Sequence, residues 1–127
     1  MRRESTIIKI DINGFNKLAQ EENPEDTARY LSAYYELAAS AVAKFGWRFV
    51  KAIGDCILIS TEGDAEPNKI TAFYQIIQEN FDVSLYYRPC EFEEIETKVG
   101  NYSCLDVIGK DINNLFLNDA FSVGIGQ

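Results

Sequence analysis

Two aspartates stand beside glycines at the ends of apolar segments, and their carboxylates could do chemistry together. Asp11 closes an apolar run over residues 6–11. Asp55 follows Gly54 between two β-prone runs, which predicts a tight β-hairpin over residues 47–60. Strands that each deliver a carboxylate to one sheet edge can hold a pair of Mg²⁺ ions for phosphoryl transfer. An aspartate at a hairpin tip can also be a turn residue and nothing more.

The composition narrows the chemistry that remains. The chain has 127 residues, a formal net charge of −8 and no histidine. Without histidine, catalysis must use carboxylates, Lys, Tyr, Cys or a bound metal. The negative charge argues against nucleic acid or an anionic membrane as partner. No apolar run is long enough for a membrane segment, and three cysteines without a CxxC motif indicate free thiols and a cytoplasmic protein.

Further elements must position the two carboxylates. Gly14 and Phe15 open a short helical turn whose N–H groups could cradle phosphate oxygens of a substrate. Asn23 and Pro24 predict the start of a long amphipathic helix that ends at Gly46. The remaining pattern predicts a loop over 63–67, a helix over 70–81, strands over 83–87 and 92–99 separated by Pro89, a loop or strand end over 100–106, a helix over 109–120 and the start of a strand within 121–127.

This order of elements predicts the fold class. Hairpins alternate with helices, so we expect one α+β domain over residues 1–127. Its sheet should be rich in antiparallel pairs, with helices packed on one face, as in ferredoxin-like and palm-like domains.

Three short motifs resemble a known family. DINGF at 11–15, KAIGD at 51–55 and DVIGKDIN at 106–113 are similar, in order and in spacing, to the signature segments of class III nucleotidyl (adenylate and guanylate) cyclases. The resemblance extends from about residue 6 to residue 120. It implies a catalytic domain of the palm-like type that acts in cyclic nucleotide signalling.

The resemblance also implies roles for single residues. Asp11 and Asp55 match the metal-binding aspartates of the family, with the Ile12 carbonyl as a further ligand for two Mg²⁺ or Mn²⁺ ions. Lys51 and Asp106 match the pair that reads the purine, and their polarity favours adenine. Asn113 matches the asparagine that orients the ribose.

The implied reaction is the conversion of ATP to cyclic AMP and pyrophosphate. In the family, the metal aspartates come from one protomer, whereas the purine readers and the asparagine come from the other. The resemblance therefore implies a homodimer with two composite sites.

The chain departs from the family pattern in its catalytic half. Four residues after Asn113 the family has an arginine that stabilises transition-state charge, and this chain has Leu117. The sequence also stops at Gln127, before the segment that supplies a further lysine in the family. A slow cyclase, a degenerate nucleotide-binding or dimerisation module, and another palm-like nucleotidyl-transfer protein therefore stay open. The hairpin AIGDC lacks the second glycine and second acid of a diguanylate cyclase.

Overall fold

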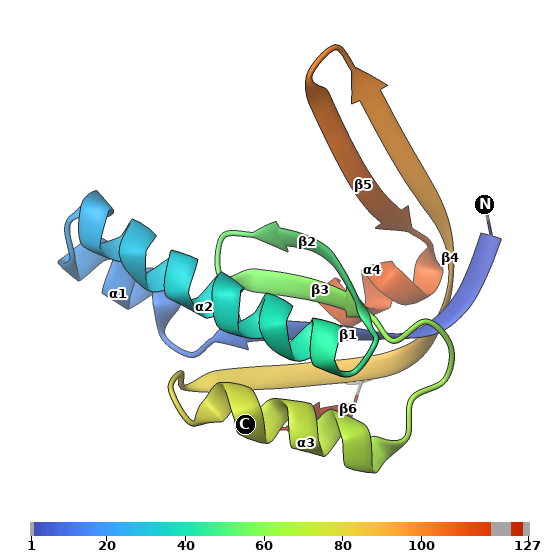
Figure 1. Cartoon of the computed structure of the whole chain (residues 1–127), viewed down its shortest axis with the longest axis horizontal. Coiled ribbons are helices and arrows are strands. Elements are labelled where there is room, and N and C mark those ends of the chain that lie inside the picture. The colour runs from blue at the N-terminus through green and yellow to red at the C-terminus, as the bar shows by residue number, and fades with distance from the viewer. Residues whose placement is uncertain (1, 118–122, 126–127) are drawn as a thin grey trace.

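The computed structural model describes residues 2–117 and 123–125. Its helices and strands follow the order β1, α1, α2, β2, β3, α3, β4, β5, α4, β6 (Figure 1). Their bounds are β1 Arg2–Ile12, α1 Phe15–Glu21, α2 Pro24–Lys44, β2 Arg48–Ile53, β3 Cys56–Ser60, α3 Pro67–Gln78, β4 Val83–Val99, β5 Tyr102–Ile108, α4 Lys110–Leu117 and β6 Val123–Ile125.

The strands form one sheet in the order β2-β3-β1-β4-β5, and β6 pairs separately with β4. Each pairing is antiparallel. This arrangement of helices and sheet confirms the predicted α+β class. Strand β1 lies at the centre, and its side chains alternate between two apolar clusters, with Ile8 and Ile10 in one and Ile7 in the other.

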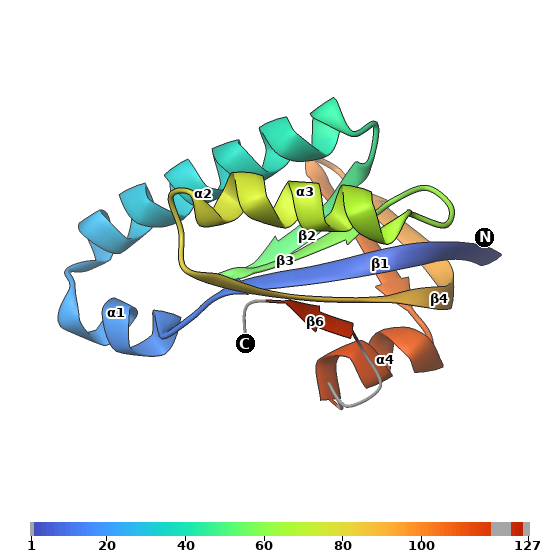
Figure 2. The ribbon, with the colours of Figure 1, turned by 90° about the horizontal axis from the view of Figure 1, so that it is seen from below.

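Helices α2 and α3 cover one face of the sheet, where the apolar cluster with Ile8 and Ile10 lies (Figure 2). Asn23 caps α2 by accepting a hydrogen bond from the Asp26 N–H, and Pro24 occupies the first turn, as the sequence predicts. The apolar stripes of both helices bury against the sheet through Tyr34, Ala38, Ala41, Val42, Ile70, Phe73 and Ile77. Helix α3 begins at Pro67, three residues before the predicted start, because proline is accommodated at a first helical position.

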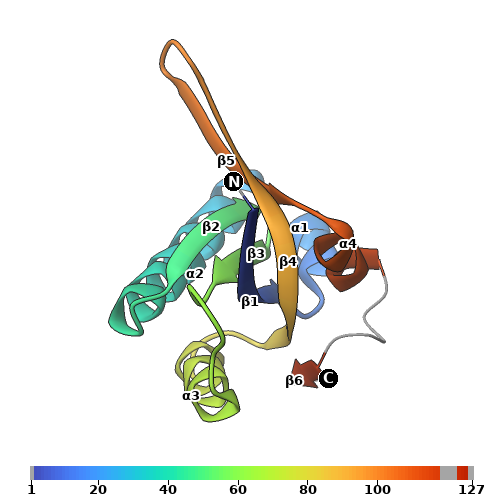
Figure 3. The same cartoon turned by 90° about the vertical axis from the view of Figure 1, so that its right-hand side faces the viewer.

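Helix α4 lies on the opposite face, whereas the sequence placed all helices on one face (Figures 2 and 3). Its buried residues Ile112 and Leu115 join Ile7, Leu58 and Phe92 in the second apolar cluster. The sheet therefore has a core on each side. The predicted helix over 109–120 is observed through Leu117, and residues 118–120 lie outside the described part of the chain.

Strand β4 is continuous, which corrects the prediction of two strands interrupted at Pro89. Pro89 pairs with Thr6, whose own N–H and C=O bond towards Gly63 and Thr61 on the other side of β1. The backbone nitrogen of Pro89, which has no hydrogen to donate, therefore faces away from β1. On that side, β6 pairs with residues 85–87 of β4 and β5 pairs with residues 93–99, so Pro89 falls between the two paired segments. Proline is tolerated at such an unpaired edge.

A second correction concerns residues 100–106, predicted as a loop or strand end, of which residues 102–106 belong to strand β5. Its pairing with β4 forms a two-stranded arm, residues 93–108, that projects from the body of the protein (Figures 1 and 3). The pairing with β4 across the turn at Gly100 decides this conformation, and the turn residues Gly100 and Asn101 made the segment resemble a loop. The strand start predicted within 121–127 is observed as β6. Within the described residues, no helix is long and apolar enough to cross a membrane.

Candidate functional site

The β2–β3 turn, which carries Asp55, lies against the end of β1, which carries Asp11. We call Asp11, Asp55 and the Ile12 main chain the carboxylate corner. The Ile12 N–H donates to Asp55 Oδ2 at 3.0 Å, which ties the turn to the end of β1. Gly54 adopts a positive φ of 59°, a conformation that favours glycine, and its carbonyl accepts a hydrogen bond from the Tyr35 hydroxyl. The turn thus presents Asp55 from a fixed backbone.

The charges of Asp11 and Asp55 both affect two neighbouring side chains, Tyr34 and Cys56. Burial raises the pKa of the Tyr34 hydroxyl, and Asp55 and Asp11 raise it further. Burial likewise raises the pKa of the Cys56 thiol to about 11; Lys9 opposes this shift, and Asp11 and Asp55 add to it. Both carboxylates therefore act on the same two neighbours.

Gly14 and Phe15 lie next to this corner. Gly14 is the N-cap of α1 with φ 71°, and Phe15 packs against the first apolar cluster. The loop before them is fixed because Asn13 donates from its main chain and side chain to Asp82, at 2.9 and 3.0 Å. Helix α1 has only seven residues, so its phosphate-binding role stays a prediction.

Lys51 and Asp106 meet at a second place. Lys51 Nζ lies 3.3 Å from Asp106 Oδ1, and the Val107 N–H donates to that same oxygen at 2.8 Å. The two residues come from β2 and β5, the opposite edges of the five-strand path through the sheet. Val50 and Val107, also from these strands, share the second apolar cluster. The sheet therefore curls until its edges face each other, and we call the contact between β2 and the arm the seam.

The corner and the seam are separate within one chain. Lys51 aligns with Leu58, and Leu58 with Lys9, two residues before Asp11. Two strand spacings and two residue steps put Lys51 roughly 10 Å across the sheet and about 7 Å along it from Asp11. The structure thus pairs the predicted residues in two groups, each with its own surroundings.

Asn113 lies exposed on α4. Its N–H donates to the Gly109 carbonyl at 3.0 Å in the first turn. Asp111 anchors this turn, since its Oδ2 accepts from the Glu91 N–H at 2.9 Å and its Oδ1 lies 3.3 Å from Arg88. A side chain at Gly109 would bring its Cβ within 2.9 Å of the Glu91 carbonyl, so glycine permits this close approach. The orienting role of Asn113 stays a prediction.

Lys9 is a residue that the sequence analysis left without a role. It is 7% exposed, two residues before Asp11 on the same face of β1. Its Nζ lies 4.8 Å from the ring centroid of Tyr86 and 5.5 Å from that of Phe116 on α4. The signal was available, because a lysine inside the apolar run IIKIDI is unusual for a buried strand.

Comparison with known proteins identifies the family. A sequence model of the adenylate and guanylate cyclase catalytic domain matches residues 2–110. The chain therefore belongs to this family, the class III nucleotidyl cyclase domains, as the motifs predicted. No curated protein sequence matches it significantly.

Solved structures agree with this fold. The guanylyl cyclase Cya2 is similar with 17% identity and a TM-score of 0.75, over 98% of this chain and 73% of that one. The guanylate cyclase domain of RhGC from Catenaria anguillulae, in complex with GTP, has 15% identity and a TM-score of 0.77, over 98% and 76%. The adenylyl cyclase CyaB from P. aeruginosa has 16% identity and a TM-score of 0.69, over 97% and 74%.

Proposed function

We propose that the chain is a slow adenylate cyclase that converts ATP to cyclic AMP and pyrophosphate. The observation that carries the proposal is the 3.3 Å pair of Lys51 and Asp106. An adenine edge offers a ring nitrogen that accepts a hydrogen bond and an amino group that donates one. An ammonium beside a carboxylate supplies the matching donor and acceptor. Asp11 and Asp55, as ligands for the metal ions, provide the second part of the same proposal.

Two divalent cations, Mg²⁺ or Mn²⁺, belong to this function. Asp11, Asp55 and the Ile12 carbonyl would hold them, and these groups fit because hard cations prefer oxygen ligands. Among the described residues, no group of three or more His, Cys, Asp or Glu side chains could hold a metal ion. Further ligands would therefore come from the phosphates of the nucleotide and from water. Bound cations would supply acidification of the ribose 3′-hydroxyl and neutralisation of phosphate charge.

The protein residues bind and orient the nucleotide. Lys51 donates to the adenine ring nitrogen, and Asp106 accepts from the amino group. Asn113 holds the ribose so that its 3′-oxygen faces the α-phosphorus in line with the leaving group. The 3′-hydroxyl loses its proton to solvent, and its oxygen bonds to the α-phosphorus. The bond between the α-phosphorus and the oxygen that bridges to the β-phosphorus breaks, and pyrophosphate leaves with that oxygen.

We further propose that two copies of the chain share each site. The separation of the corner from the seam within one chain supports this, because one nucleotide could then contact the corner of one copy and the seam of the other. Sedimentation with ATP present should detect a homodimer. A monomer at high protein concentration, with nucleotide bound, would contradict this part of the proposal.

A second candidate is a nucleotide-binding regulatory module without turnover. Leu117 favours it, because leucine cannot donate to developing negative charge where the family has an arginine.

Incubation with ATP and Mn²⁺, followed by mass spectrometry for cyclic AMP, tests the proposal, with GTP in parallel. We expect cyclic AMP in excess over cyclic GMP, and at least about 10²-fold less cyclic AMP from Asp55→Asn. Cyclic GMP as the main product would overturn the choice of base. Bound ATP without product would favour the regulatory module.

A further inference from the structure

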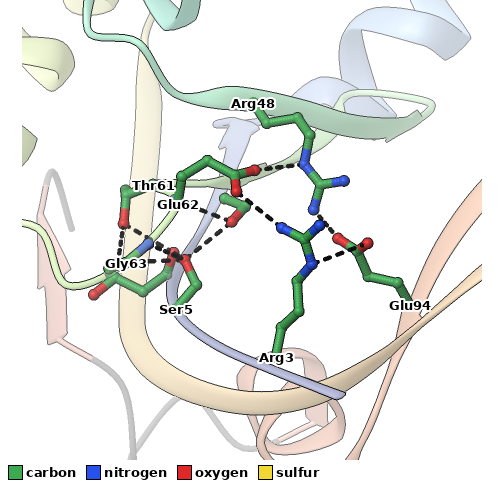
Figure 4. A network of polar contacts seen from close by, with 9 residues as sticks. Arg3, Ser5, Arg48, Thr61, Glu62, Gly63 and Glu94 are labelled. Atoms are coloured by element: carbon green, nitrogen blue, oxygen red, sulfur yellow. Dashed lines mark hydrogen bonds and ion pairs between the residues drawn. The ribbon is translucent and has the colours of Figure 1, made fainter. Parts of the chain in front are cut away.

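Four charged residues at the seam form a closed ring of alternating sign, which we call the ion ring (Figure 4). Arg3 lies 3.0 Å from Glu62 and 3.2 Å from Glu94. Arg48 lies 2.6 Å from Glu62 and also contacts Glu94. Each acid thus touches both arginines. The Glu94 side chain is only 12% exposed and that of Arg48 28%, so these charges are shielded from much of the solvent.

The ion ring gathers four elements of the sheet. Arg3 comes from β1, Arg48 from the first position of β2, Glu62 from the turn after β3, and Glu94 from β4. Figure 4 shows the two guanidinium groups between the two carboxylates. Since β2 and the arm share no ladder of backbone hydrogen bonds, the ring joins them through side chains alone.

The turn that carries Glu62 is held in one conformation. Glu62 has φ 57°, which is uncommon for a residue other than glycine and has to be maintained by its surroundings. The Thr61 hydroxyl donates to the Gly63 carbonyl at 2.7 Å, and the Gly63 N–H donates to Ser5 Oγ at 3.2 Å. The Ser5 and Ser60 hydroxyls are 2.9 Å apart. Glu62 is thus a fixed side of the ring.

The ion ring lies directly beside the proposed purine pair. Arg48 precedes Lys51 by three residues on β2, and Glu94 aligns with Val107, the neighbour of Asp106. Burial lowers the pKa of Arg48, but its bonds and charge contacts with Glu94 and Glu62 outweigh burial, and the net pKa is raised. The guanidinium is therefore stabilised in its charged form by the partners that span the seam.

Beyond the ring, the arm has little to hold its direction. Residues 95–103 are exposed, and the exposed fraction is 43% for Ile95, 70% for Val99 and 60% for Tyr102. A two-stranded hairpin without a packed face is only marginally stable in water. The direction of the arm, and with it the position of Asp106, depends on contacts at its base.

We propose that the ion ring of Arg3, Arg48, Glu62 and Glu94 positions the purine pair by holding the arm against β2. This inference rests on the proposed function of Lys51 and Asp106. The ring residues are positioning residues, because they act through the arm and not on the nucleotide. Loss of one member should let the arm move and separate Asp106 from Lys51, while the carboxylate corner keeps its geometry.

The first experiment compares Glu94→Gln with Glu96→Gln. Both remove one negative charge from the same strand, but Glu96 is 60% exposed and, within the described part of the chain, its ion pair is with the exposed Lys98 of the arm. Glu94→Gln should weaken Mn²⁺-ATP binding at least fivefold and reduce the preference for ATP over GTP. Binding of Mn²⁺-tripolyphosphate, which has no base, should change less than twofold. Glu96→Gln should leave all three values unchanged, and equal losses for ATP and tripolyphosphate would overturn a role at the purine pair.

The second experiment follows the arm without nucleotide. Energy transfer from Trp47, the single tryptophan, to a dye on Cys104 of β5 reports the distance across the seam. Labelling at neutral pH favours Cys104, because burial raises the pKa of Cys56 to about 11 and of Cys90 to about 12. Peptide mapping confirms the labelled site. Glu94→Gln should broaden the distance distribution, and Glu96→Gln should not.

The two readouts separate the possible failures. An unchanged distance distribution in Glu94→Gln overturns the positioning role, whatever happens to ATP binding. A broadened distribution with unchanged ATP affinity overturns the link to the purine pair. If Glu94→Gln does not fold, Arg48→Lys tests the same ring, because lysine keeps the charge but loses the fork that bridges two acids. A wild-type chain that binds no ATP contradicts the proposed function itself, while energy transfer still tests the ring.

Discussion

The carboxylate corner and the seam hold charged residues in different ways. In the corner, the main chain does the holding: Ile12 donates to Asp55, and a glycine turn joins two paired strands. At the seam, Lys51 and Asp106 meet across two sheet edges that share no ladder, beside an ion ring of side chains. A backbone-held site resists changes in salt and in neighbouring side chains, whereas a site held by partly exposed ion pairs responds to both.

The largest expected effect breaks the corner. Asp55→Asn should lower the rate of cyclic AMP formation by at least about 10²-fold, because it removes one of the two carboxylates proposed to hold the metal ions. The amide oxygen can still accept from the Ile12 N–H, so folding should be preserved. Initial rates over a range of Mn²⁺ concentrations check this. Asp64→Asn, an exposed loop acid, is the control, and an equal loss there would point to net charge instead.

The next prediction tests whether catalysis needs the arginine that the family has at the position of Leu117. Leu117→Arg should raise kcat by at least about tenfold, with less change in KM, because the new donor acts mainly in the transition state. Leu117→Lys is the matched control, since it supplies a charge without the planar fork of arginine. A native kcat already near 10 s⁻¹ would show that another residue fills the role.

Removing the positive charge of Lys51 at the seam should have a smaller effect. Lys51→Gln should weaken ATP binding by about tenfold and narrow the difference between ATP and GTP, while Mn²⁺-tripolyphosphate binding stays the same. A lost hydrogen bond to a charged donor has an effect of this order. Titration calorimetry with each ligand is the measurement. Lys98→Gln is the control, because Lys98 is 69% exposed on the arm. An equal loss of ATP binding in this variant would show that the effect does not come from the contact between Lys51 and Asp106.

The smallest effect concerns stability at alkaline pH. Burial raises the pKa of Cys56, the residue after Asp55 of the corner, to about 11, from an ordinary 9.0. The thiol ionises in the unfolded chain before it does in the native one, so stability is full below about pH 9 and falls as the pH rises towards 11. The urea midpoint should decrease over this range. Cys56→Ala should reduce the slope of that decrease, and an unchanged slope would assign it to other groups.

The regions also differ in how much the sequence predicts. The β2–β3 hairpin and the cap of α2 depend on neighbouring residues such as Gly54, Asn23 and Pro24, and their predictions are confirmed. Strand β4 depends on β1, a partner far along the chain, whereas β5 pairs with the adjacent end of β4 across the turn at Gly100. Local rules placed a break at Pro89 because they could not show that Pro89 faces an interval between strands. They predicted a loop or strand end over 100–106 because Gly100 and Asn101 are typical turn residues.

The site shows the same division. The Ile12 N–H bonds to Asp55, so the β2–β3 turn lies at the end of β1 that carries Asp11, and the joint metal-binding role of the two aspartates stays a prediction. The ion ring was not predicted, because Arg3 and Glu94 each look like solvated charges until the sheet curls. The family resemblance, and not the chemistry of single residues, paired Lys51 with Asp106. Their role in reading a purine stays a prediction.

The tip of the arm has a consequence for how this protein can change over time. Gly100 turns the chain there with φ 60°, and its neighbours are exposed. Residues added or removed at this tip would lengthen or shorten the arm in solvent without disturbing either core. Related chains can therefore differ in arm length and still fold alike. The same position would accept an inserted tag or reporter peptide, which makes it a natural place to modify the protein.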